Sequence, residues 1–212
     1  PSTLTTGNQP TQNTPSDLSQ VISLKNALKY LGLTEVMSYS IISEEFLKLT
    51  GVKKENAVEL SNPLTSEWQF MRPTLIVSLS SIIAQNQNMR NNLKLFEVAK
   101  TYVPSGALAK EGIKNGDDLP IQDLYLSIIL QNSDFYIIKG IVENIFEVLG
   151  REVEFEKLEP YSSSESRQTR RVEKSNTSQT LFKPQLCAEI TTNRKAVGPL
   201  GILNKNISNH FA

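Results

Sequence analysis

The amino-acid sequence predicts an α+β fold with a mostly antiparallel sheet flanked by helices. Strand-like and helical segments are interleaved irregularly along the 212 residues, and the loops that join most of them are short. The last two strand-like segments surround Asn193-Arg194, which indicates a hairpin and therefore an antiparallel pair. No glycine-rich turn leads from a strand into a helix, as a parallel nucleotide-binding sheet would require.

The first half of the chain opens with an amphipathic helix. Ser16 is a good N-cap, apolar residues recur at three- and four-residue spacing up to Leu31, and Gly32 ends the helix. Residues 33–42 alternate apolar and serine side chains, which is typical of a strand with one drier face. The other elements expected here are a short helix at 43–51, a strand at 57–60 and a helix at 73–87.

The second half contains the most regular patterns. Residues 124–130 are almost continuously apolar, which favours an interior strand. Asp134 precedes a strongly periodic apolar segment that ends at Gly150, as expected of a capped amphipathic helix. The remaining predicted elements are strands at 94–103, 152–156, 185–191 and 196–203 and a short helix at 206–211.

The predicted organisation is one domain preceded by an arm. Residues 1–15 are rich in Thr, Asn, Gln and Pro without periodicity, so we expect an extended arm that follows an upstream domain absent from this sequence. Residues 16–212 are expected to form a single domain with flexible loops near 105–120 and 162–180. No segment is long and apolar enough to predict a membrane span.

The composition argues against several functions. Lys plus Arg and Asp plus Glu number 22 each, so the net charge is zero, whereas proteins that mainly grip phosphate backbones are usually basic. Cys187 is the only cysteine and His210 the only histidine, which disfavours a zinc site. The acidic pair Asp117-Asp118 near Glu111 lacks ligand spacing and is interpreted as a solvated loop rather than a metal site.

Several motifs in register resemble a known family. They are Asn62-Pro-Leu, Met71-Arg-Pro-Thr-Leu and Leu95-Phe-Glu, preceded by Leu31-Gly-Leu-Thr-Glu-Val and followed by Asp134-Phe-Tyr-Ile-Ile-Lys-Gly. Together they resemble the class II-like core domain of the bacterial-type beta subunit of phenylalanine–tRNA ligase. The resemblance implies a class II aminoacyl-tRNA synthetase-like (biotin-ligase-like) fold.

The resemblance also implies a setting for the domain. It predicts a cytoplasmic alpha2-beta2 assembly in which the catalytic alpha subunit is the partner and phenylalanine tRNA is bound through the complex. ATP and Mg²⁺ would act in the whole enzyme, and no cofactor would be bound by this fragment. The domain would support ATP-dependent attachment of phenylalanine to tRNA by packing against the alpha subunit.

The residues needed for class II catalysis are missing from this chain. The segment that corresponds to the phosphate-binding "F-R-x-E" reads Phe96-Glu97-Val98-Ala99, so a carboxylate stands where an arginine would bind ATP. No Gly-x-Gly-x-x-Arg segment follows near the C-terminus. We therefore predict no catalytic, cofactor-binding or metal-binding residues and no formation of aminoacyl-adenylate by this chain alone.

Six residues are candidates for contact with the alpha subunit. In the family the first-motif helices meet, and the resemblance places that role by position on residues 16–32 and their adjoining strand, with the helix after Pro73 as the next candidate. The helix that starts at Ser16 has a narrow apolar seam that either docks on a partner helix or lies under the domain's own sheet. Trp68 is an interface anchor or a core residue, and Arg72 reaches a partner or forms a surface ion pair. The candidates are Val21, Leu24, Leu28, Leu31, Trp68 and Arg72.

Two other functions remain open on sequence grounds. In the first, the chain would be an independent ligase on the same fold. The absence of the class II arginines argues against this function. Alternatively it is a tRNA-binding module that uses the arm 1–15 and the loop 162–180 with Arg167, Arg170 and Arg171, which the neutral charge disfavours.

Overall fold

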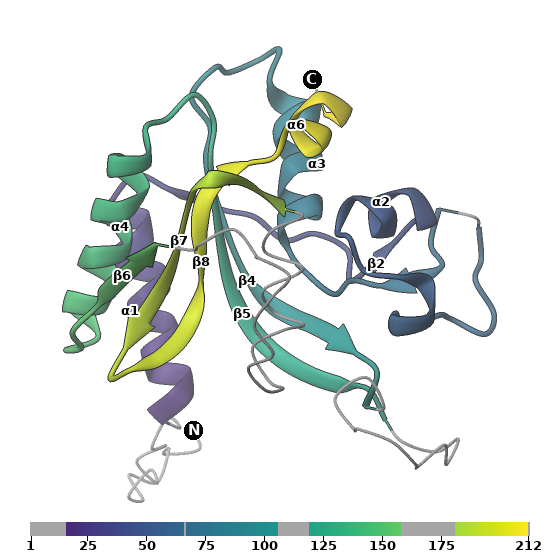
Figure 1. The fold of residues 1–212 in the computed structure, drawn as a ribbon, viewed down its shortest axis with the longest axis horizontal. Coiled ribbons are helices and arrows are strands. Elements are labelled where there is room, and N and C mark those ends of the chain that lie inside the picture. Colours follow the sequence, from purple (N-terminus) through teal and green to yellow (C-terminus); the bar gives the residue numbers. More distant parts are fainter. Residues whose placement is uncertain (1–15, 66, 106–118, 158–180, 212) are drawn as a thin grey trace, which may run out of the picture.

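The computed structural model of the protein describes residues 16–65, 67–105, 119–157 and 181–211 (Figure 1). The predicted arm at 1–15, most of the loop near 105–120 and the loop at 162–180 lie outside these residues. The helices are α1 (Ser16–Tyr30), α2 (Glu44–Leu49), α3 (Ile76–Asn86), α4 (Phe135–Val148) and α6 (Lys205–His210), with a 3-10 turn η1 (Lys54–Asn56). The strands are β1 (Thr34–Glu35), β2 (Ile41–Ile42), β3 (Phe70–Met71), β4 (Lys94–Val103), β5 (Ile121–Leu130), β6 (Glu154–Lys157), β7 (Phe182–Thr192) and β8 (Lys195–Leu203).

The strands of the described residues form three sheets. One has the order β1-β4-β5, another β6-β7-β8, and β2 pairs with β3. Only β1 and β4 run parallel, and every other pair is antiparallel. Figure 1 shows α1 and α4 on one side of the long β4–β5 pair, and α2 with β2 on the other. The predicted α+β class with mostly antiparallel pairing is confirmed, although the strands are divided among three sheets.

The main core lies where α1 and α4 meet the two larger sheets. Its buried residues include Leu28 from α1, Phe96 from β4, Ile145 from α4 and Leu200 from β8. The regularly spaced apolar residues of α4 supply four of the buried side chains. The side chain of Asp134 caps the start of the helix, because it accepts a hydrogen bond from the N–H of Tyr136 at 3.3 Å. The helix predicted after Asp134 is therefore confirmed.

Two smaller cores stabilise the rest of the described chain. Ile42, Leu47 and Phe70 bury the contact of α2 with the β2–β3 ribbon. In the second small core, Leu181 and Ile207 pack α6 against the start of β7. Both short helices were predicted, and each begins after a capping side chain, Ser43 for α2 and Asn204 for α6.

The hairpin between β7 and β8 has the backbone that its turn sequence predicts. Asn193 and Arg194 both adopt positive φ, 50° and 61°, as the two central residues of a type I′ turn do. The turn aligns Thr192 with Lys195 and continues the pairing to Phe182 and Leu203. The predicted hairpin is confirmed and is longer than the sequence pattern suggested.

Three predicted strands are wrong in part. Residues 33–42 contain only β1 and β2, and between them the N–H of Ser38 donates to the side chain of Glu97 instead of to the backbone of a strand. The strand expected at 57–60 is reduced to an isolated bridge between Glu59 and Phe70. Strand β5 pairs only with β4 in the described residues, and Leu124 is 56% exposed, so it is not an interior strand there.

Gly201 is required by the close contact between β7 and β8. A Cβ atom added there would lie 2.7 Å from the carbonyl oxygen of Leu186 and 2.9 Å from the Cβ of Cys187. We expect Gly201→Ala to destabilise the protein by about 1–3 kcal/mol in urea unfolding, because the two strands must separate. The matched control is Gly198→Ala in the same strand, where the added methyl meets no atom within 4 Å. Equal stability of the two variants would contradict this account.

Candidate functional site

Glu97 is buried on the face of β4 that looks away from the main core. Successive residues of a strand point to opposite faces, so Phe96 enters the core and Glu97 faces the other way. Its exposure is only 2%. A buried carboxylate is costly unless cations and hydrogen-bond donors surround it. The local structure therefore has to supply both.

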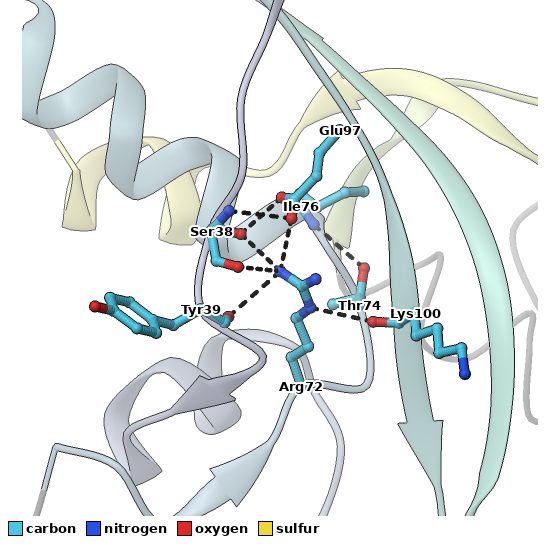
Figure 2. A network of polar contacts seen from close by, with 7 residues as sticks. All are labelled: Ser38, Tyr39, Arg72, Thr74, Ile76, Glu97 and Lys100. Atoms are coloured by element: carbon cyan, nitrogen blue, oxygen red, sulfur yellow. Dashed lines mark hydrogen bonds and ion pairs between the residues drawn. The ribbon is translucent and has the colours of Figure 1, made fainter. Parts of the chain in front are cut away.

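Arg72 supplies the positive charge from the segment that follows β3. Its Nη1 atom lies 3.0 Å from Oε1 of Glu97, and the arginine is itself only 2% exposed. Nε donates to the carbonyl oxygen of Lys100 on β4 at 3.2 Å. Figure 2 shows the guanidinium inserted between β4 and the segment that carries Ser38 and Tyr39.

Ser38 completes this network, which we name the Arg72–Glu97 network (Ser38, Arg72 and Glu97). The backbone N–H of Ser38 donates to Oε1 of Glu97 at 3.1 Å, and its hydroxyl donates to Oε2 at 2.6 Å. The same hydroxyl accepts from Nη1 of Arg72 at 2.6 Å. Both carboxylate oxygens are thus bound by donors from this chain. The negative charge of this carboxylate repels phosphate groups.

Arg72 and Leu28 do not form the subunit surface that was predicted for them. Leu28 is 0% exposed and belongs to the main core, so the α1 seam lies at that position under the domain's own sheet. Arg72 is buried by its pair with Glu97, and the surface ion pair expected as its alternative is also wrong. Both side chains are buried inside the fold, so neither is exposed to another subunit.

The other four interface candidates keep some exposure. Val21 and Leu24 are half-buried, with Leu24 packed against the main core, and Leu31 is 36% exposed. Trp68 is half-buried and packs edge-on against the ring of Tyr39, with 4.8 Å between the ring centres. Contact of these four residues with an alpha subunit remains a prediction.

An open groove of about 640 Å³ follows the end of α1 and strand β1. It is lined by Lys29, Leu33, Thr34, Glu35 and Met37. Hydrogen bonds from Lys25 and then Lys29 hold the pKa of the Glu35 carboxyl below its usual range. These ion pairs tie α1 to β1, and they place charged groups beside an exposed methionine.

The Glu35 ion pairs give a pH-dependent contribution to stability. A carboxyl whose pKa is lowered by folding adds stability above its unfolded pKa, and this stability is lost as the pH falls through the folded value. We expect Glu35→Gln to cost less than about 1 kcal/mol at pH 7, because the pairs are partly exposed. The difference from the wild type should begin to shrink as the pH falls below the unfolded pKa of glutamate, about 4.3, and should disappear only below the lowered pKa of Glu35, as measured by urea unfolding across pH. A difference that grew in acid would contradict the assignment.

The remaining candidate chemistry is absent from the described part of the chain. No group of three His, Cys, Asp or Glu side chains there is arranged to hold a metal ion. Cys187 is buried, and burial raises the pKa of its thiol, which disfavours the reactive thiolate. No helix in the described ranges is long and apolar enough to cross a membrane.

Ser38 is the site residue that sequence reasoning missed. Its alternation with Met37 and Tyr39 predicted that the apolar residues form the drier face, and this is wrong, because Met37 is 91% and Tyr39 75% exposed while Ser38 faces the buried Glu97. The pattern did not show that its polar side faces Glu97, because 59 residues separate the two in sequence. Only the tertiary pairing of β1 with β4 brings them together.

The fold defines a class II aminoacyl-tRNA synthetase-like core. Two solved structures of pyrrolysyl-tRNA synthetase from Desulfitobacterium hafniense share it, with TM-scores of 0.62 and 0.61 at 12% and 14% identity. The matches cover 95% and 89% of this chain and 64% and 59% of those chains. Residues 1–212 match the model of the phenylalanyl-tRNA synthetase beta chain CLM domain, and the chain belongs to that family.

Curated relatives agree with this family and with the resemblance seen in the motifs. The phenylalanine–tRNA ligase beta subunit of Fusobacterium nucleatum is 33% identical over 202 residues, which are 89% of this chain and 22% of that protein. The human phenylalanine–tRNA ligase beta subunit is 29% identical over 214 residues, covering 100% of this chain and 32% of that protein. The chain thus spans less than a third of the length of these relatives.

Proposed function

We propose that this chain is a non-catalytic core domain of a phenylalanine–tRNA ligase beta subunit, which supports the reaction by packing against the catalytic alpha subunit. The assembly is an alpha2-beta2 tetramer in the cytoplasm. Phenylalanine tRNA is bound through the complex. ATP and Mg²⁺ act on the alpha subunit, and this domain binds no cofactor.

One observation carries the non-catalytic part of this proposal. At the position that corresponds to the ATP-binding arginine, Glu97 is buried and bonded through both oxygens to groups of its own chain. A triphosphate at this strand would meet a fixed negative charge in a poorly hydrated place, where charges interact more strongly than in water. A cation is needed there for catalysis, and Arg72 cannot supply it because Nε and Nη1 are already bonded to Lys100, Ser38 and Glu97.

Family membership supports the partner part of the proposal. The relatives are named beta subunits, a name that belongs to one kind of subunit in an enzyme with at least two. A domain with a synthetase fold and no catalytic residues gains a function when it orients a catalytic subunit.

The test combines a binding measurement with an activity measurement. This chain and the alpha subunit of phenylalanine–tRNA ligase from the same organism are purified together and analysed by gel filtration, and each is assayed for phenylalanine-dependent pyrophosphate exchange with ATP. We expect a stable complex and no exchange by this chain alone, with the complete ligase as the positive control. Exchange by the isolated chain would overturn the proposal in favour of an independent ligase. Tight, salt-sensitive binding of tRNA without the alpha subunit would favour the tRNA-binding module.

A further inference from the structure

Residues 40–65 and 67–71 form a small unit beside the main body of the domain, which we name the α2 module. It contains α2, η1 and the β2–β3 pair, and Figure 1 shows it on the side of the β4–β5 pair that faces away from α1 and α4. Its buried residues Ile42, Leu47 and Phe70 pack with one another in a cluster separate from the main core. The module therefore has a small hydrophobic core of its own.

The backbone of the α2 module is closed on itself. The N–H of Arg72 donates to the carbonyl oxygen of Ser40 at 2.9 Å, so the chain leaves the module beside the point where it enters. Inside the module, the N–H of Leu60 donates to the carbonyl oxygen of Gln69 at 2.8 Å, and the N–H of Gln69 donates to that of Ile42 at 3.2 Å. Because these bonds join residues of the module to each other, we expect them to break together.

The Arg72–Glu97 network fastens the neck of the module to the main body. Glu97 on β4 binds the N–H and hydroxyl of Ser38 on the entering segment and Nη1 of Arg72 on the leaving segment, as Figure 2 shows. The N–H of Tyr102 on β4 also donates to the carbonyl oxygen of Arg72 at 3.0 Å. The neck thus belongs to the main body, and an opening of the module would stop there.

A second attachment of the module lies at the end of α6. The ring of Phe46 on α2 packs edge-on against the rings of Phe211 and His210, with 5.4 Å and 6.0 Å between ring centres. Nδ1 of His210 also lies 3.8 Å from Oε1 of Glu45, which is an ion pair only when the histidine is protonated. Phe211 packs in addition against the small core around Ile207, which holds α6 to β7. We name Phe46, His210 and Phe211 the α6 latch.

We propose that the α2 module opens by local unfolding while the rest of the domain stays folded, and that the α6 latch sets how often it opens. The module is shorter than the roughly 40 residues below which one core seldom keeps a chain folded without additional links. Detachment at the latch therefore leaves a cluster too small to keep the module folded. The inference concerns contacts within this chain alone, so it does not depend on the function proposed above.

The only tryptophan of the chain reports on the module directly. Trp68 lies in the module and packs edge-on against the Tyr39 ring at the neck, with 4.8 Å between ring centres. We expect the fluorescence of Trp68 to change at a lower urea concentration than the far-UV circular dichroism, which reports α1 and α4, the longest helices of the described ranges. Coincident transitions of the two signals would show that the module unfolds with the whole domain and would overturn the proposal.

Amide hydrogen exchange under native conditions locates the boundary of the opening. We expect the N–H groups of Leu47, Leu60 and Gln69 to exchange with one shared free energy of opening, below that of the α4 amides. The N–H of Ser38, bonded to Glu97 at the neck, should stay as protected as the amides of β4. Module amides that exchanged only at the free energy of α4 would contradict the proposal.

Substitutions in α6 test the role of the latch. Phe211→Leu and His210→Ala each remove one ring, and each should speed the exchange of the module amides by about 2- to 10-fold, the range that aromatic pairs contribute, with α4 unchanged. The leucine at 211 keeps an apolar side chain for the small core of α6. The matched control is Asn209→Ala, an exposed residue of the same helix outside the latch, which should change neither rate. Equal acceleration in the module and in α4, or none in either variant, would show that the latch does not control the opening.

Discussion

Replacing Arg72 by leucine is expected to destabilise the protein by about 3–5 kcal/mol, or to prevent it from folding. The substitution removes the only cation recorded within ion-pair distance of Glu97 in the described residues, and it leaves that carboxylate buried. It also removes the donors to Lys100 and Tyr39, whose carbonyl oxygens lose these bonds. Urea unfolding followed by circular dichroism measures the loss directly.

A matched pair of variants separates the ion pair from simple packing. The double substitution Arg72→Met with Glu97→Leu removes both charges and fills a similar volume, so it should recover a large part of the stability lost in Arg72→Leu. Lys100→Met serves as a surface control, because the Lys100 side chain is exposed and, among the described residues, its ammonium group bonds Gln122 at 3.2 Å. A double variant no more stable than Arg72→Leu would show that the charge balance is not the main cost.

Leu28→Asp is expected to unfold the domain, with a loss of more than about 4 kcal/mol. Leu28 is 0% exposed in the main core beside Phe96 and Ile145, where a carboxylate would be buried without a cation. The variant should be recovered in low yield and should show no cooperative thermal transition at the temperature of the wild type. A loss of alpha-subunit binding by this variant would say nothing about an interface, because the fold itself is lost.

The control for Leu28→Asp lies on the same helix. Ile22 is 48% exposed, so Ile22→Asp should change the free energy of unfolding by less than about 1 kcal/mol. If the two variants were equally destabilised, the core assignment of Leu28 would be wrong. If both were neutral, α1 would not pack as the structure shows.

Much of the fold could be predicted because local patterns and global packing agree. The apolar period after Asp134 specifies α4, and Asn193-Arg194 specifies a hairpin turn. Failures came where a segment serves a tertiary partner instead of a neighbouring strand. Residues 33–42 alternate as a strand does, but the N–H and hydroxyl of Ser38 bind the side chain of Glu97 on β4, so only two short strands form within the segment.

The site was predicted only in its individual parts. Glu97 was identified as a residue that excludes phosphate, from the motif in which it stands. Its pairing with Arg72 joins residues 25 positions apart, and periodicity carries no information about such a contact. The α1 seam shows the same limit, because an amphipathic stripe does not reveal whether its own sheet or another subunit covers it. Burial of Leu28 decides this question for one position of the seam.

The closed hydrogen-bonding of Glu97 has a consequence for how such a domain can change. Restoring an arginine at position 97 would place two guanidinium groups against each other in a dry interior, with Ser38 unable to neutralise either. A cation at position 97 therefore requires a second, compensating substitution at position 72. Because a change at either position alone leaves like charges or an unpaired charge buried, the pair couples the two positions, and single substitutions are tolerated more easily on the outer surface of the domain.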